Sequence, residues 1–174
     1  MANATTIAKR AGLGILILAL LALLYWTTLY PRDRAPGFYL FGSAGDESVE
    51  DWTFANDVRL CTLQVYAAGW RPHAINLNCM ATPEGDLYLS CSVCERKYWA
   101  SQVGTDSPGR LRLDGVVYPV KVNRVTDQEQ MDMSWQARLA KLNSFDDDDP
   151  LNPRPDPNAV RPDHWWTFRV ESRS

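Results

Sequence analysis

Two cysteines and two basic residues lie close together in the stretch CSVCERKYW, residues 91–99. Cys91 and Cys94 have the spacing of a redox-active pair or of one half of a zinc site. Arg96 and Lys97 suit an anion, because Arg presents a planar fork of N–H groups and Lys a compact positive charge. The stretch therefore carries two candidate chemistries, one based on sulfur and one on anion binding.

The zinc and redox interpretations both need a setting that the chain does not supply. A structural zinc site requires four converging ligands, normally in two pairs, whereas Cys61 and Cys79 stand alone and the chain has 2 His. A thioredoxin-like pair requires a βαβ setting, whereas the pattern around Cys91 and Cys94 is antiparallel β. We predict no metal site. A structural disulfide is favoured if the domain lies outside the cytoplasm, and Cys61–Cys79 and Cys91–Cys94 are both candidates.

Alternating, β-prone segments bounded by turn residues predict six strands. They cover residues 57–66, 73–81 and 86–91, a hairpin over 110–125 around Asp114-Gly115, and 164–172. A short helix followed by a loop is predicted after the third of these strands. Antiparallel strands in a domain of this size favour a small barrel over an open sheet, because a barrel leaves no exposed edge.

Three of the four cysteines are predicted to face the interior of this barrel. Side chains alternate along a strand, which places each of the three on the same face as apolar neighbours two and four residues away. The three are Cys61, Cys79 and Cys91. In such a position a free cysteine behaves as a small hydrophobe. Only Cys94 lies beyond its strand.

The segment 126–143 has the pattern of an amphipathic helix. Thr126 and Glu129 are predicted to form the capping box that begins it. One stripe at helical spacing consists of Met131, Trp135, Leu139 and Leu142. We interpret this stripe as core packing. The following segment, 144–163, is acidic and rich in Pro, and its run of Asp lacks the ligand spacing of a calcium loop, so we predict a solvated loop.

The N-terminus carries an uncharged apolar run, residues 11–30, after a short basic tail, residues 1–10. About 20 apolar residues span a bilayer, and Tyr and Trp gather at the end of the run as in an interfacial belt. No small-x-small cleavage site follows, which favours an uncleaved signal anchor over a cleaved signal peptide. The basic tail favours a cytoplasmic N-terminus. The expected location is the inner or plasma membrane, with the C-terminal domain outside the cytoplasm.

Residues 31–48 are rich in Pro, Gly and Ser, which predicts a linker. Its FYLF segment, residues 38–41, is expected either to pack back on the domain or to lie at the membrane surface. The folded domain then occupies residues 49–174. The net charge of -3 gives no indication of nucleic-acid binding.

Five segments carry a resemblance to a known family: EDWTFANDVRLCTLQVY, RPHAINLNCMATPEGDLYLSC, ERKYWASQV, GRLRLDGVVYPVKVNRVTD and HWWTFRV. Their order over residues 51–170 resembles the split-barrel flavin-binding superfamily, which includes pyridoxamine 5′-phosphate oxidase-like and deazaflavin-dependent nitroreductase-like proteins. The expected fold is mainly β (α+β), a six-stranded antiparallel split β-barrel with two helices, preceded here by one transmembrane helix. The resemblance implies FMN or a deazaflavin as cofactor, a small-molecule substrate and a homodimer whose subunits share the flavin cleft.

In that superfamily a basic residue just after the third strand holds the flavin phosphate. The resemblance therefore assigns Arg96 and Lys97 to the phosphate, with Ser90 as a hydroxyl donor. Asn76 and Asn78 alternate with the inward apolar residues and so lie on the predicted flavin side. The implied function is that of a membrane-anchored flavin-dependent oxidoreductase, in which no side chain stands out as an obligatory acid, base or nucleophile. The alternative is a non-enzymatic, membrane-tethered barrel with structural disulfides that dimerises or binds a partner, since fold alone does not decide function.

Overall fold

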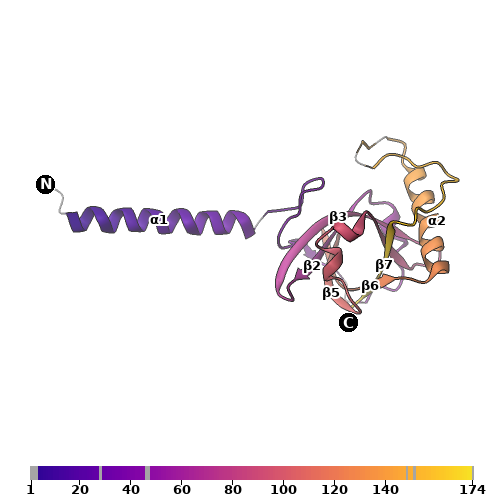
Figure 1. The fold of residues 1–174 in the computed structure, drawn as a ribbon, viewed down its shortest axis with the longest axis horizontal. Coiled ribbons are helices and arrows are strands. Elements are labelled where there is room, and N and C mark those ends of the chain that lie inside the picture. The colour runs from indigo at the N-terminus through magenta and orange to yellow at the C-terminus, as the bar shows by residue number, and fades with distance from the viewer. Residues whose placement is uncertain (1–3, 28, 46–47, 148, 151, 174) are drawn as a thin grey trace.

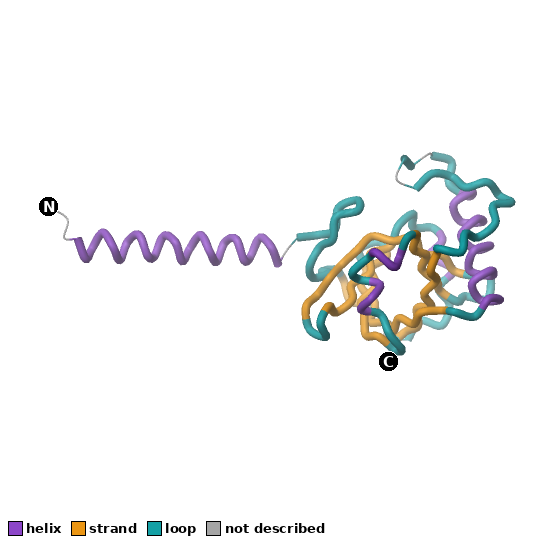
Figure 2. The backbone as a smooth tube through the Cα atoms, in the orientation of Figure 1, coloured by secondary structure: helices purple, strands orange, loops and turns teal. Residues whose placement is uncertain are grey.

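An N-terminal helix extends away from a closed barrel, and a second helix packs on the barrel wall (Figure 1). The structure is a computed structural model that describes residues 4–27, 29–45, 48–147, 149–150 and 152–173. Figure 2 shows the strands as a ring, with the second helix and the loop that follows it on one side.

The predicted strands and helices occur in the predicted order, and the structure adds β1 and η1, which were not predicted. The described elements are α1 (Ala4–Thr27), β1 (Ser43–Ala44), the 3-10 helix η1 (Thr53–Asn56), β2 (Cys61–Ala67), β3 (Arg71–Ala81), β4 (Leu87–Ser92), the 3-10 helices η2 (Cys94–Arg96) and η3 (Ala100–Gln102), β5 (Ser107–Leu113), β6 (Val116–Val125), α2 (Gln128–Ser144) and β7 (Trp165–Ser172). The predicted strands are all present, with bounds shifted by a few residues. The short helix expected after β4 consists of the two single turns η2 and η3.

Pairing of β6 with β7 closes the sheet into a barrel. The sheet runs in the order β1-β6-β5-β2-β3-β4-β7, and β7 pairs with β6 as well as with β4. The strand β1 lies outside the ring and pairs with β6 in parallel, whereas the pairings around the ring are antiparallel. This ring confirms the predicted six-stranded antiparallel barrel, in which each ring strand has two neighbours.

The β5–β6 hairpin turns at Asp114-Gly115, as predicted. Asp114 has a φ of 43° and Gly115 a φ of 81°, so both lie in the left-handed region. A two-residue turn of type I′ requires this conformation at both positions, because its twist matches that of the strands. The hairpin register then pairs Leu113 with Val116 directly across the turn.

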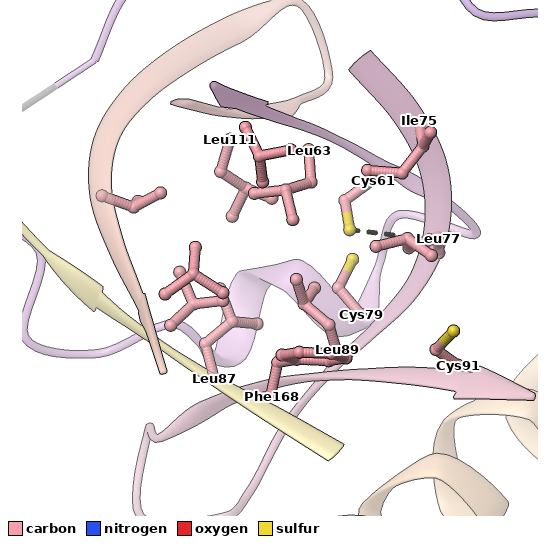
Figure 3. Packing of buried hydrophobic residues seen from close by; sticks show 14 of the residues in the cluster. Cys61, Leu63, Ile75, Leu77, Cys79, Leu87, Leu89, Cys91, Leu111 and Phe168 are labelled. Atoms are coloured by element: carbon pink, nitrogen blue, oxygen red, sulfur yellow. Dashed lines mark hydrogen bonds between the residues drawn. The ribbon is translucent and has the colours of Figure 1, made fainter. Parts of the chain in front are cut away.

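Apolar side chains that alternate along the strands fill the barrel interior (Figure 3). Cys61 and Cys79 are each 0% exposed and Cys91 is 2% exposed, which confirms the predicted inward face of all three. The rings of Trp99 and Phe168 lie 5.0 Å apart between centroids. Because Phe168 belongs to β7 and Trp99 to the segment between η2 and η3, this contact fastens that segment to the core.

The residue that caps α2 is Asp127, and the predicted capping box of Thr126 and Glu129 is wrong. The Asp127 carboxylate accepts a hydrogen bond from the N–H of Gln130 at 2.9 Å, and the helix begins at the residue after Asp127. Asp is a stronger cap here because its short, charged side chain satisfies an unpaired N–H and also interacts favourably with the helix dipole.

The predicted apolar stripe of α2 faces the barrel. Trp135, Leu139 and Leu142 are buried. Met131, at the start of the stripe, is half-buried and packs against a small cluster on the outer side of the barrel wall. The stripe therefore covers the outside of the barrel, which confirms its interpretation as packing.

The helix α1 contains a segment, Ala8–Trp26, that is long and apolar enough to cross a membrane by length and composition. Its large apolar side chains are exposed, as expected if lipid covers them. The helix ends at Thr27, before the predicted end at residue 30. Pro31 contributes to this difference, because proline disfavours helical backbone in the residue before it.

The predicted linker is bound to the barrel where the structure describes it, and we call residues 29–45 the strap. The side chain of Leu40 is 0% exposed, and its N–H donates to Oε1 of Gln64 at 2.8 Å. Gly37 and Ala74 exchange backbone hydrogen bonds of 2.8 and 3.1 Å. The FYLF segment therefore packs back on the domain, which is one of the two alternatives predicted for it.

Replacing Leu40 with Ala should loosen the strap. The substitution removes a fully buried side chain, so we expect the free energy of unfolding to fall by about 2–5 kcal/mol. Urea denaturation of the full-length protein in detergent, followed by Trp fluorescence, measures this change. Phe41→Ala is the matched control, because Phe41 is 46% exposed. Equal denaturation midpoints for the two variants would show that the strap does not stabilise the barrel.

Candidate functional site

A disulfide shapes the turn that carries Arg96 and Lys97. Cys91, near the end of β4, is bonded to Cys94, the first residue of η2. Val93 between them has a φ of 50°, in the left-handed region. The chain therefore leaves β4 in a tight turn, after which the side chains of Arg96 and Lys97 are exposed.

The structure contains the Cys91–Cys94 disulfide and leaves Cys61 and Cys79 as free, buried thiols. Since the two CxxC sulfurs are bonded to each other, they are not thiolate ligands for zinc. Within the described ranges, no group of three or more His, Cys, Asp and Glu could hold a metal ion. The CxxC motif thus acts in this structure as a clamp on the turn.

Four cations gather near this turn, and we call Arg34, Arg71, Arg96 and Lys97 the cationic patch. Arg71 lies over the ring of Tyr98, with its Cζ 5.8 Å from the ring centroid. Arg34, from the strap, acts electrostatically on Lys97. None of the ion pairs among described residues involves a member of the patch. Positive charge that is not held in an ion pair is suited to attracting an anion.

Partial burial and the charge of nearby arginines lower two pKa values at the patch and beside it. Burial and, to a smaller extent, Arg34 lower the pKa of Lys97. Burial and, to a smaller extent, Arg71 lower the pKa of His73. The His73 ring meets the Tyr98 ring edge-on, with 5.7 Å between centroids. An anion among these groups would offset the repulsion, so the patch favours negative charge.

Asn76 faces the outside of β3, as predicted, but its amide is already hydrogen-bonded. The Oδ1 atom accepts from Oγ1 of Thr62 at 2.9 Å, and Nδ2 donates to the carbonyl oxygen of Pro31 at 3.3 Å. Because Pro31 belongs to the strap, the strap covers this part of the outer face. The strap and β2 thus already occupy the Nδ2 and Oδ1 atoms of Asn76.

Asn78 and Ser90 are register partners on β3 and β4, so the structure brings these two predicted residues together. The amides of Asn78 and Asn152 bond to each other in both directions, at 2.6 and 2.9 Å. Ser90 is 6% exposed, and its Oγ has no hydrogen-bond partner among the described residues. Ser90 pairs with Thr167, whose Oγ1 lies 3.4 Å from Oγ of Ser134 on α2. The loop after α2 and α2 itself therefore cover these positions.

A buried cation, Arg138 of α2, lies over the same wall of the barrel. Its Cζ is 4.7 Å from the ring centroid of Trp165 and 5.6 Å from that of Trp135. Burial lowers the pKa of Arg138 to about 10, so the guanidinium remains charged at neutral pH. Its Nε and Nη1 have no hydrogen-bond partner within the part of the chain that the structure describes. The aromatic rings partly compensate this buried charge.

Four cations were not predicted from the sequence, and they differ in how visible they are in it. Arg138 and Lys141 lie beside the apolar stripe of α2, and helical periodicity places both toward the buried side. Arg34 and Arg71 carry no such signal. They reach the patch only through contacts between segments that are distant in the sequence.

The five predicted site residues do not line one open pocket. Arg96 and Lys97 are exposed at the turn, Asn76 lies beneath the strap, and Asn78 and Ser90 lie beneath α2 and its following loop. Their assignment to a flavin stays a prediction. Of the five, the two basic residues are the ones that a ligand can reach in this structure.

Replacing Arg71 with Gln should raise the pKa of His73. The change removes the positive charge that, after burial, lowers this pKa. Titration of the His73 ring by NMR in the full-length protein measures the shift, and His164, which is exposed, serves as the control within the same chain. Arg173→Gln should leave His73 unaffected. A His73 pKa that stays the same in Arg71→Gln would show that this charge does not act on the ring.

No family model matches this chain, and no curated protein matches it either. A barrel fold by itself does not name a superfamily, because one fold hosts many functions.

Proposed function

We propose that this chain is a membrane-anchored, flavin-binding oxidoreductase-like protein whose cationic patch holds the phosphate of FMN or of a deazaflavin. The observation that carries the proposal is the gathering of four cations beyond the end of β4, none of them in an ion pair among the described residues. This is the position that the resemblance to the split-barrel superfamily assigns to the phosphate.

The residues of the patch suit a phosphate monoester. The guanidinium of Arg96 offers two parallel N–H donors to a pair of phosphate oxygens, and Lys97 adds a compact charge. Tyr98 is 49% exposed and offers a flat ring beside them. A bound flavin would supply hydride or electron transfer to a small-molecule acceptor, while the protein supplies position and electrostatics.

The ring end of the flavin fits the predicted residues less well than the phosphate end. The amides of Asn76 and Asn78 are bonded to the strap and to the loop after α2. We propose that a second copy of the chain completes the cleft for the ring, as in the expected homodimer. Trp70, which precedes Arg71, is 73% exposed and is available to such a partner.

The proposed location is the inner or plasma membrane, with the barrel outside the cytoplasm. The helix α1 is long and apolar enough to serve as the anchor. The Cys91–Cys94 disulfide supports the orientation, because disulfides persist in oxidising compartments.

Spectroscopy on the full-length protein in detergent tests the flavin proposal. We expect a flavin absorption band, either in the purified protein or after FMN or a deazaflavin is added. Replacing both Arg96 and Lys97 with Ala should weaken flavin binding roughly ten- to hundredfold, because hydrogen bonds to charged groups contribute about 1.5–3 kcal/mol. The matched control is Arg173→Ala, an exposed cation beyond β7. A colourless protein that binds neither cofactor would overturn the proposal, and undiminished affinity in the double variant would place the phosphate elsewhere.

A second candidate function is that of a non-enzymatic, membrane-tethered barrel that dimerises or binds a partner. The observation that favours it is the engagement of both Asn76 and Asn78 by other parts of the chain. The Cys91–Cys94 disulfide is consistent with this candidate, which was predicted to contain structural disulfides. The absorption measurement with added FMN or deazaflavin separates the two functions, because this candidate predicts that neither cofactor binds.

A further inference from the structure

Two free cysteines face each other inside the barrel. Cys61 of β2 and Cys79 of β3 are each 0% exposed, and Figure 3 shows their sulfur atoms directed toward one another. Cys61 pairs directly with Leu77, and Cys79 is the next residue on the same face of β3. The Cys61 thiol lies 3.5 Å from the carbonyl oxygen of Leu77. Cys91 also faces inward, but Figure 3 shows its sulfur directed away from this pair.

A lysine side chain reaches into the core at this pair. Lys141 of α2 is 4% exposed. Its Nζ donates to the carbonyl oxygens of Ala55 and Cys79, each at 2.6 Å, and lies 3.8 Å from Sγ of Cys79. None of the ion pairs among described residues involves Lys141. The two carbonyl oxygens partly compensate the buried ammonium, and the remaining contacting group, the Cys79 thiol, can supply negative charge to it.

The two thiols differ in their electrostatic surroundings. Burial would raise the pKa of Cys79, but the hydrogen bond from Cys61 and the charge of Lys141 outweigh it and lower the pKa. Burial, and next the neighbouring Cys79, raise the pKa of Cys61 well above its usual value. Of the two thiols, Cys79 is therefore the one whose surroundings favour the thiolate, whereas those of Cys61 favour the thiol. The thiolate is the nucleophilic form of cysteine.

A groove on the surface leads to this site. It has a volume of about 600 Å³ and lies between η1, the β3–β4 turn and α2, with Asn56, Ala81, Ala137 and Lys141 among its lining residues. Lys141 is therefore part of the groove wall, and its Nζ contacts Cys79 in the core. Lys141 thus links the groove wall to the thiol pair.

We propose that Cys61 and Cys79 form a peroxide-reactive dithiol, with Cys79 as the nucleophile, Lys141 as its counterion and a small hydroperoxide as the substrate. The Cys79 thiolate attacks the terminal oxygen of the hydroperoxide. An S–O bond forms as the O–O bond breaks, and the departing alkoxide or hydroxide takes a proton from water. This step converts Cys79 to a sulfenic acid.

The second step closes a disulfide. The Cys61 thiol attacks Sγ of the Cys79 sulfenic acid, an S–S bond forms, and the hydroxyl leaves as water with the Cys61 proton. The dithiol is oxidised by two electrons and the hydroperoxide is reduced to an alcohol or to water. A dithiol reductant restores the pair by thiol–disulfide exchange. Cys61 and Cys79 occupy diagonal positions on neighbouring strands, which lie farther apart than direct partners. Formation of the Cys61–Cys79 disulfide therefore draws β2 and β3 together locally.

The rate of disulfide closure in the full-length protein in detergent tests the role of Lys141. The protein is reduced, freed of reductant and exposed to hydrogen peroxide, and peptide mapping by mass spectrometry follows each disulfide. We expect Lys141→Met to slow Cys61–Cys79 closure about tenfold or more, because the thiolate fraction falls tenfold for each unit by which the pKa rises above the working pH. Closure of Cys91–Cys94 in the same molecules should keep its rate.

The matched control is Lys121→Met, which replaces a half-buried lysine on β6 and should leave both rates unchanged. Two outcomes overturn the proposal. One is an unchanged rate of Cys61–Cys79 closure in Lys141→Met. The other is a Cys61–Cys79 pair that reacts only after the chain is unfolded.

Two cysteine variants test which sulfur reacts first and keep the proposal testable if Lys141→Met does not fold. Cys61→Ala should accumulate a sulfenic acid at Cys79 that a dimedone probe traps. Cys79→Ala should leave Cys61 unlabelled under the same conditions. Labelling of Cys61 in Cys79→Ala, or the absence of labelling in Cys61→Ala, would overturn the assignment of Cys79 as nucleophile. Alanine suits both sites, because a buried free cysteine packs as a small hydrophobe.

Discussion

Closure of the sheet by pairing between β6 and β7 is the constraint on which the rest of the structure depends. The two strands are joined from Val120↔Ser172 to Val125↔Thr167. Because β7 also pairs with β4, the ring strands keep no free edge. The chain reaches β7 only after α2 and the acidic loop, so these segments must pass over the outside of the barrel. The closed ring thus determines where a ligand has room to bind.

The covering segments explain why the cationic patch lies around the turn after β4 and the first residue of β3, and not over the middle of the outer face of β3. The strap holds the outer face of β3 at Asn76, and the loop after α2 holds it at Asn78. The turn after β4 lies beyond both. The Cys91–Cys94 disulfide and the contact of Trp99 with the core fix its shape. Long charged side chains on a fixed turn lose less freedom when they bind an anion, which favours binding.

The four cysteines take on different roles because of their different positions in the barrel. The pair at the end of β4 is bonded and shapes the surface turn. The pair on β2 and β3 is free, buried and in contact with a cation from α2. The barrel interior is a low-dielectric medium, so one ammonium group there changes thiol chemistry far more than it would in water. Cys61 and Cys79 would otherwise only pack in the core, but beside this ammonium group their thiol pKa values shift in opposite directions.

The sequence alone determined the features that depend on local pattern. The alternation of side chains established the strands and the inward face of Cys61, Cys79 and Cys91, and the apolar run established a helix able to span a membrane. Asp114-Gly115 located the hairpin, because its backbone conformation is a local requirement. Helix capping was harder to place, since Thr126 and Asp127 are both good caps and only the hydrogen bond to Gln130 decided between them.

Only the tertiary structure decided which of these residues meet. Strand parity gave Cys61, Cys79 and Cys91 the same inward face, yet the three-dimensional arrangement bonded Cys91 to Cys94 and left the other pair free. It also brought Arg34 to Lys97, and Lys141 of α2 to Cys79. These contacts join segments far apart in the chain, and their energies depend on burial and on distance in space. A local sequence pattern contains neither quantity, which is why it could propose the candidate residues but could not assemble them into a site.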